Sequence, residues 1–222
     1  MRDTPYRDEV RSSVQRPYGF MSYGRNPWSP ESDRPPNERL RRFHTRLTEH
    51  LVELTDLDAG IPAVYLDQRI PIGTDWQDEL KLRLARCQVL VPVLAPRLFS
   101  SRWCELEWDC FERRQQLHRD RGTFIRSAVV PVLWAPLRPA DIPRPYSQVQ
   151  YAHQDFHPDY QRLGLLGLQN HGRHKVFNEV AYQLAQKIVE VAVSARLDPC
   201  EPHEFDSLFA SANASQGEKH DV

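Results

Sequence analysis

The segment that most constrains the fold of this chain is the apolar run Val89–Leu94, which reads Val-Leu-Val-Pro-Val-Leu. Because almost every residue in it is apolar, neither face of a strand at this position would suit water. Such a run is typical of a parallel sheet that helices cover on both faces. The serines Ser100 and Ser101 follow shortly and are suited to begin a helix. We therefore expect a strand, a short loop and a helix in succession.

Strands and helices are expected to alternate along most of the chain. An apolar stripe at spacings of three and four after Asn37 predicts an amphipathic helix. Thr74 is expected to cap a helix that buries Trp76, and a last helix covers about 175–195. The expected strands are residues 18–23, 62–66, 88–94, 124–134 and, at the edge, 149–156. This alternation predicts a flavodoxin-like α/β fold, a three-layer sandwich with a central parallel sheet of about five strands.

The chain has 222 residues, which fits one domain with tails. Residues 1–16 are polar and are expected to form a disordered arm. The domain is expected to span 17–197, and residues 198–222 to form a disordered tail or a linker. Residues 27–36 form a proline-rich insertion in a loop. Residues 158–172 contain three glycines, and their structure is not predicted.

Composition disfavours several classes of function. A net charge of −1 and an isoelectric point near 6.8 argue against a nucleic-acid partner. The four cysteines include no C-x-x-C pair, which indicates reduced thiols and no metal site. The sequence has no membrane-length apolar run and no signal-peptide pattern, so we expect no membrane association and a cytoplasmic location. G-x-G-x-x-G, P-loop and G-x-S-x-G motifs are also absent.

Three short segments carry the candidate chemistry: Tyr18–Arg25, Tyr65–Leu80 and Ser100–Glu107. In the third segment, Trp103 and Glu107 are four residues apart, so in a helix they share a face. Open α/β sheets bind ligands at the carboxyl ends of their strands. A carboxylate beside an indole at that edge is suited to hold a sugar next to an acid.

Together the three segments resemble the sequence boxes of a TIR domain. The first is similar to the F-x-S-Y strand of that family, and the second to its D-x-x-I-x-x-G-x-x-W/I-x-x-E-L loop and helix. The third is similar to S-x-W-C-x-x-E, which carries the catalytic glutamate in the NAD-cleaving members. The resemblance runs from about Tyr18 to about Ala195. It is closest to the actinobacterial TIR-like FxsC proteins, which accompany ribosomally made peptide clusters.

The resemblance implies an NAD+ nucleosidase that releases nicotinamide and forms ADP-ribose or a cyclic product. Glu107 is then the catalytic residue, and its carboxylate stabilises positive charge on the ribose. NAD+ or a related dinucleotide is the substrate, no separate cofactor is implied, and self-association or another TIR domain supports activity. The implied substrate-binding residues are Ser22, Tyr23, Arg25, Asp67, Arg69 and Trp103. The implied interface loop contains Ile70, Pro71, Ile72 and Gly73.

The residues also allow alternatives. Glu107 alone fits an ordinary surface carboxylate of a helix, paired with an arginine such as Arg114. Trp103 alone fits a packing residue at the start of the helix, and Glu105 is expected to face solvent. The whole domain also fits a scaffold without catalysis, which docks another TIR domain or a partner in peptide biosynthesis. The position of Glu107, in an open cleft or at a protein interface, discriminates between the two functions.

Overall fold

A computed structural model describes residues 15–27, 35–66, 76–122, 126–149 and 154–217. Four strands form its sheet: β1 Gly19–Ser22, β2 Val64–Leu66, β3 Val89–Leu94 and β4 Val132–Leu133. The α-helices are α1 Glu38–Leu54, α2 Trp76–Arg86, α3 Pro96–Phe99, α4 Arg102–Asp120, α5 Pro158–Asn170, α6 His174–Ala195 and α7 Asp206–Gly217. Short 3-10 helices are η2 Pro139–Asp141, η3 Tyr146–Gln148 and η4 Pro202–Phe205.

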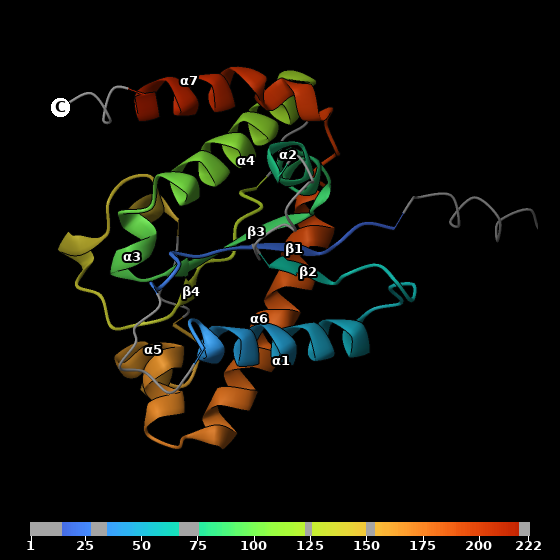
Figure 1. The fold of residues 1–222 in the computed structure, drawn as a ribbon. Helices are drawn as coiled ribbons and strands as arrows, with labels where there is room; N and C mark the ends of the chain where they lie inside the picture. The colour runs from blue at the N-terminus through green and yellow to red at the C-terminus, as the bar shows by residue number, and fades with distance from the viewer. Residues whose placement is uncertain (1–14, 28–34, 67–75, 123–125, 150–153, 218–222) are drawn as a thin grey trace, which may run out of the picture.

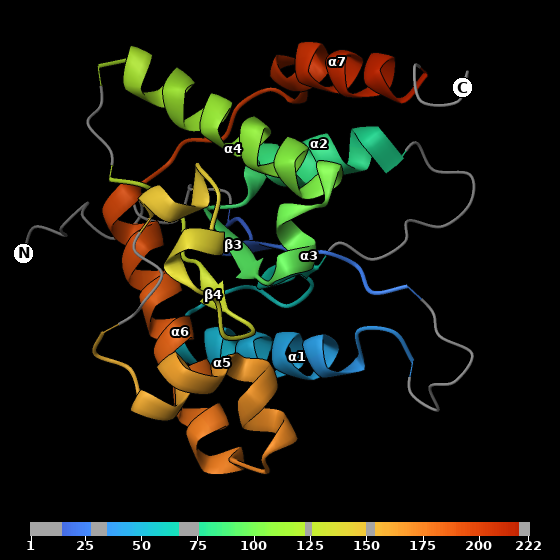
Figure 2. The same ribbon diagram turned by 90° about the vertical axis from the view of Figure 1, so that its left-hand side faces the viewer.

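The sheet is parallel, with the strand order β2-β1-β3-β4. Met21 of β1 is paired with Leu66 on one side and Val91 on the other. Helices α1, α5 and α6 cover one face of the sheet, and α2 and α4 cover the other, with α7 on the outer side of α4 (Figure 1; Figure 2). The predicted three-layer α/β fold is therefore confirmed, with four strands in the described residues where about five were expected.

Side chains of the central strands alternate between two cores, because successive residues of a strand point to opposite faces. In β3, Val89, Val91 and Val93 join the core beneath α1 and α6. Leu90 and Leu94 join the core beneath α2 and α4. Complete burial of one such side chain contributes roughly 1.5–3 kcal/mol. The apolar run from which the fold was predicted thus connects both layers.

The fourth strand is shorter than the predicted 124–134. Regular pairing with β3 is confined to Val132–Leu133, although Val129 forms an isolated bridge with Leu90. Pro131 lies between these two points, and a proline has no N–H to donate to a ladder. The first predicted residues, 124 and 125, lie outside the described part of the chain.

The edge strand predicted for 149–156 is not found among the residues described there. Val149 follows the 3-10 helix η3, and residues 154–156 form turn and irregular structure. Residues 150–153 lie outside the described part. Residues 158–172, for which no structure was predicted, contain helix α5, and Gly164 interrupts this helix with φ of 63°.

The carboxyl-terminal residues differ from the disordered tail or linker that was predicted. Residues 202–217 form η4 and α7, which pack on α2 and α4 (Figure 1). Phe205 and Phe209 are buried in the same core as Leu84 and Phe111. Small alanines and serines make up much of α7 after Phe209, so the helix has little amphipathic pattern of its own. Its position depends on apolar surface supplied by other helices.

A buried arginine fastens this extension to the domain. The guanidinium of Arg114 donates to the carbonyls of Leu84, Cys87, Leu197 and Asp198, at 2.5–3.1 Å. Only 1% of Arg114 is exposed, and burial is the main cause that lowers its pKa. Arg114 therefore joins the end of α2 to the segment after α6, and it is not the partner that was considered for Glu107.

Two further predictions need correction. Trp76 was expected to be buried, but it is 37% exposed, because it is the first residue of α2 and lies at the end of that layer. The disordered arm was expected to include Gln15 and Arg16. Arg16 instead donates to the Leu197 carbonyl at 2.9 Å, and Gln15 bonds the backbone around Asp56. Among the described residues, no helix is both long and apolar enough to cross a membrane.

Candidate functional site

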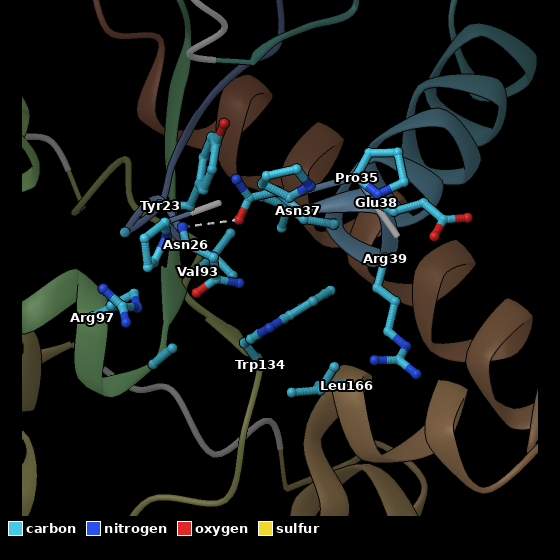
Figure 3. Close-up of a pocket in the computed structure, with 15 residues that line it drawn as sticks. Tyr23, Asn26, Pro35, Asn37, Glu38, Arg39, Val93, Arg97, Trp134 and Leu166 are labelled. Carbon is cyan, nitrogen blue, oxygen red and sulfur yellow. Dashed lines mark hydrogen bonds between the residues drawn. The ribbon is translucent and has the colours of Figure 1, made fainter. Parts of the chain in front are cut away.

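The strand order creates one preferred place for a ligand. Strand β1 lies at the centre, with β2 on one side and β3 on the other. The chain therefore leaves β1 and β3 toward different neighbours, which opens a crevice at their carboxyl ends. A cavity of about 310 Å³ lies at this edge, between the loops after β1, β3 and β4 and the start of α1. Figure 3 shows its lining.

Aromatic, cationic and amide side chains line the cavity. Tyr23 follows β1, and Trp134 follows β4. The indole of Trp134 is half-buried and packs against the ring of Phe43, with 6.3 Å between ring centroids. Arg39 of α1 and Arg97 of α3 also line the cavity, on opposite sides of Trp134 (Figure 3). The arrangement suits a ligand with a flat group and negative charge.

Gly24 brings the loop after β1 against α3. A Cβ atom at this position would lie 2.3 Å from the carbonyl carbon of Arg97 and 2.6 Å from the amide nitrogen of Leu98. These neighbours are backbone atoms, which no rotamer change can remove. A glycine is therefore required for this wall of the cavity.

Gly164 performs the same role on the opposite wall. Its φ of 63° lies in the left-handed region, and a Cβ there would lie 2.5 Å from the carbonyl oxygen of Trp134. The same oxygen accepts a hydrogen bond of 2.9 Å from the amide of Leu166. Helix α5 is thereby held against the end of β4, and this contact positions Trp134.

The two ends of the proline-rich insertion meet beside the cavity. The amide of Asn26 donates to Oδ1 of Asn37 at 3.2 Å (Figure 3). Asn37 adopts a left-handed conformation with φ of 61°, and its side chain makes no capping hydrogen bond to α1. The first turn of α1 therefore faces the cavity without a cap from this side chain.

The predicted catalytic motif lies at the start of α4. Ser101 caps the helix, and its hydroxyl accepts a bond of 3.3 Å from the amide of Cys104. Glu107 follows in the second turn and is only 2% exposed, whereas Glu105 is exposed as predicted. Trp103 is half-buried. The prediction of an ordinary surface carboxylate at position 107 is therefore wrong.

The buried side chains of Tyr146 and Cys110 lie near Glu107. Tyr146 packs its ring against Trp108, with 4.6 Å between centroids. Burial raises the pKa of Tyr146, and the nearby Cys104 and Glu107 raise it further. Burial likewise raises the pKa of Cys110, with Glu107 among its charged neighbours. Glu107 is thus almost completely buried, and a charge shielded from water interacts strongly with its neighbours.

Trp103 connects this motif to the second sequence box. Its ring meets that of Trp76 edge to face, with 4.5 Å between centroids. Trp76 begins α2 and is the first described residue after the loop 67–75. The indole pair thus joins the start of α4 to the exit of that loop.

The structure brings together only part of the predicted set. Tyr23 lines the cavity, whereas neither Trp103 nor Glu107 is among its lining residues. Ser22 is 2% exposed at the end of β1, and Arg25 is exposed in the loop that follows. The predicted residues that lie outside the described part are Asp67, Arg69, Ile70, Pro71, Ile72 and Gly73.

The lining residues that were not predicted as site residues include Arg39, Arg97 and Trp134. For Trp134 a signal existed, because it directly follows a predicted strand and ligands bind at strand ends. For Arg39 and Arg97 the sequence contained no such signal, because each lies near the start of a helix, where solvent-exposed arginines are common. Gly164 was noticed in the sequence, but its contact with Trp134 depends on the tertiary fold.

Comparison with known families assigns the fold. Residues 39–164, more than half of the chain, match the family described as TIR domain. The chain belongs to the TIR domain family. Among solved structures, this TIR domain is similar to the TIR domains of the activated Roq1 resistosome, which directly recognises the pathogen effector XopQ. The identity is 18% and the TM-score 0.36, over 76% of this chain and 82% of that chain. No curated protein matches the sequence.

The matched residues include β2, β3, β4 and the helices between them, with Glu107 and the walls of the cavity around Trp134 and Arg97. They do not include α6, η4 or α7. The carboxyl-terminal extension fastened by Arg114 is therefore a feature of this TIR domain beyond the matched segment.

Proposed function

We propose that this TIR domain is an NAD+ nucleosidase. It hydrolyses the bond between nicotinamide and ribose, and it releases nicotinamide with ADP-ribose or a cyclic form. Self-association activates it, and no separate cofactor takes part. The observation that carries the proposal is the carboxylate of Glu107, which is almost completely buried in the second turn of α4 within a segment that resembles the family's S-x-W-C-x-x-E box.

Glu107 supports the reaction by electrostatics. Departure of nicotinamide leaves positive charge on the ribose, and a fixed carboxylate stabilises that charge. The effect is larger in a site of low polarity than in water. Burial among Tyr146, Cys104 and Cys110 supplies such surroundings. Water then adds to the ribose carbon from which nicotinamide has left, or a hydroxyl of the same substrate does so in cyclisation.

Trp103 and the cavity bind the rest of the substrate. Trp103 shares the helix face of Glu107 and is half-buried, so its indole is suited to pack against the nicotinamide ribose. The cavity beside Tyr23 and Trp134 lies at the edge of the sheet where ligands of such folds bind. It takes the nucleotide portion of the dinucleotide.

Self-association completes the site through the second box. The indole contact between Trp76 and Trp103 connects the loop 67–75 to the motif that contains Glu107. A partner that contacts this loop therefore acts close to the catalytic residue. In this proposal Ile70, Pro71, Ile72 and Gly73 contact another copy, while Asp67 and Arg69 contact substrate.

A second candidate function is supported by one specific observation. Glu107 is 2% exposed and does not line the cavity. A chain in which this carboxylate only supports the fold would be a scaffold that docks another TIR domain or a partner protein. In this second proposal the partner belongs to peptide biosynthesis, as the resemblance to FxsC proteins implies.

Nicotinamide release from NAD+ discriminates between the two functions. Purified protein is assayed dilute and under crowding, because self-association is expected to raise the rate. Glu107→Gln keeps the size of the side chain and removes its charge. Glu105→Gln removes an exposed charge from the same helix and is the matched control. Release that is lost only in Glu107→Gln, with both circular dichroism spectra unchanged, supports the nucleosidase.

No release by the wild-type protein under either condition supports the scaffold. Equal release by the two variants would show that Glu107 does not stabilise the reacting ribose.

A further inference from the structure

We propose that the cavity at the carboxyl ends of β1, β3 and β4 selects a dinucleotide whose adenosine ribose carries a 2′-phosphate. This inference rests on the proposed function, because it names which dinucleotide that same site prefers. The residues that would make the selection are Arg39, Arg97 and Trp134, all of which line the cavity.

Two positive charges in the cavity have no acidic partner among the described residues. Within the described residues, neither Arg39 nor Arg97 forms an ion pair, although arginines elsewhere on the surface commonly do. Of the described residues that line the cavity, Glu38 alone is acidic. Its carboxylate contacts the guanidinium of Arg42 at 2.5 Å and points away from the centre of the cavity (Figure 3). Among the described residues, the cavity therefore offers cationic groups and no free carboxylate.

The two guanidinium groups lie on opposite sides of one indole. Arg97 comes from α3 and Arg39 from α1, and Trp134 lies between them (Figure 3). A planar base can stack on an indole or pack beside it. A ligand that stacks there and meets both arginines then needs two separate anionic groups, attached at different positions of the sugar that carries its base. A 2′-phosphate and a 5′-diphosphate on one adenosine satisfy this requirement.

The side chains that ordinarily recognise a ribose also favour a 2′-phosphate at this cavity. Sites selective for an unphosphorylated ribose commonly use a carboxylate to bind the 2′-hydroxyl, whereas an arginine accommodates a 2′-phosphate. Guanidinium groups bind phosphate through paired, charge-assisted hydrogen bonds. The volume of about 310 Å³ is at the lower end of the range for small-molecule sites, and suits one nucleotide unit.

The walls hold these groups in place before a ligand arrives. Gly24 packs directly on the backbone of Arg97, and Gly164 packs directly on the backbone of Trp134. Neither contact leaves space for a side chain, so α3 and the end of β4 keep fixed positions. A fixed site loses less conformational entropy on binding.

Calorimetric titration tests the selection without relying on turnover. Full-length protein carrying Glu107→Gln is titrated with 2′,5′-ADP and 5′-ADP, and then with NADP+ and NAD+. We expect the 2′-phosphorylated member of each pair to bind about tenfold to hundredfold more tightly, as one added charge-assisted contact provides. Arg39→Gln and Arg97→Gln should each remove most of that preference. Arg41→Gln is the control, because Arg41 is exposed on α1 and does not line the cavity.

Equal affinity within each pair, or no binding of either member, overturns the inference. So does a preference that survives in both arginine variants. The outcomes are separable from the proposed function. Selective binding without nicotinamide release by the wild-type protein leaves the inference standing and contradicts the nucleosidase. Nicotinamide release by a protein that has no preference for the 2′-phosphate supports the nucleosidase and contradicts the inference.

Discussion

At the scale of single residues, the backbone conformation and the space around a glycine determine what a substitution there would cost in stability. Gly164 and Gly122 both have positive φ, at 63° and 81°. A Cβ at position 164 would overlap the Trp134 backbone, whereas one at position 122 would meet nothing within 4 Å. The two glycines therefore separate the cost of backbone conformation from the cost of a steric clash.

We expect Gly164→Ala to destabilise the protein by about 1–3 kcal/mol more than Gly122→Ala. Both substitutions strain the backbone by about 1 kcal/mol, and only the first forces α5 away from β4. Urea unfolding of the two variants measures the difference. Equal losses of unfolding free energy would show that the contact with Trp134 relaxes without cost.

His44 provides a prediction for pH. Its Nε2 lies 2.9 Å from the Val64 carbonyl, and burial lowers its pKa below the ordinary 6.5. The neutral ring is therefore favoured in the folded state. The stabilisation is present above the unfolded pKa, and it is lost as pH falls through the lower folded pKa.

We expect the free energy of unfolding to fall between about pH 7 and pH 5, and to fall less in His44→Gln. The glutamine cannot gain a proton in this range. Urea unfolding at several pH values checks the prediction. An identical pH dependence in wild type and variant would assign the loss to other groups.

At the scale of elements, α7 and η4 form a cover on α2 and α4. Lys81 contacts the Asp206 carboxylate at 2.6 Å, and its ammonium lies 5.0 Å from the Phe209 ring centroid. Surface ion pairs of this kind contribute little. The apolar burial of Phe205, which is 0% exposed, is the larger contribution.

We expect Phe205→Ala to cost about 3 kcal/mol, the ordinary loss for a buried aromatic side chain. Ser207→Ala, at an exposed position of the neighbouring helix, should change stability by less than about 0.5 kcal/mol. Chemical unfolding gives both values, and hydrogen exchange shows whether residues 202–217 open separately. If Phe205→Ala is as stable as Ser207→Ala, the extension is not part of the cooperative core.

At the scale of the whole molecule, local patterns predicted the layers, and tertiary contacts determined the site. The run Val89–Leu94 and the stripe that begins at Leu40 carry their own periodicity, so their elements were predictable. Helix α7 has little such pattern, and Phe209 of α7 and Phe205 of η4 become buried only against α2 and α4. Helix α7 was therefore not predicted from the sequence.

In the candidate site too, one part was predictable from a local motif and the other part depends on tertiary contacts. The segment Ser100–Glu107 contains its motif within eight neighbouring residues, and resemblance to the family identified it. The cavity draws its walls from segments far apart in the chain, among them Tyr23, Arg97, Trp134 and Leu166. Only the parallel sheet brings these segments to one edge, so no local pattern indicates their proximity.

The central claim is that Glu107 acts in cleavage of the bond between nicotinamide and ribose. The most direct measurement is the rate of nicotinamide release by concentrated wild-type protein and by Glu107→Gln, with either dinucleotide as substrate. We expect measurable nicotinamide release by the wild type. We expect the rate to be at least about a hundredfold lower in the variant, as for other groups that stabilise developing charge. Equal rates for two folded proteins would contradict this claim.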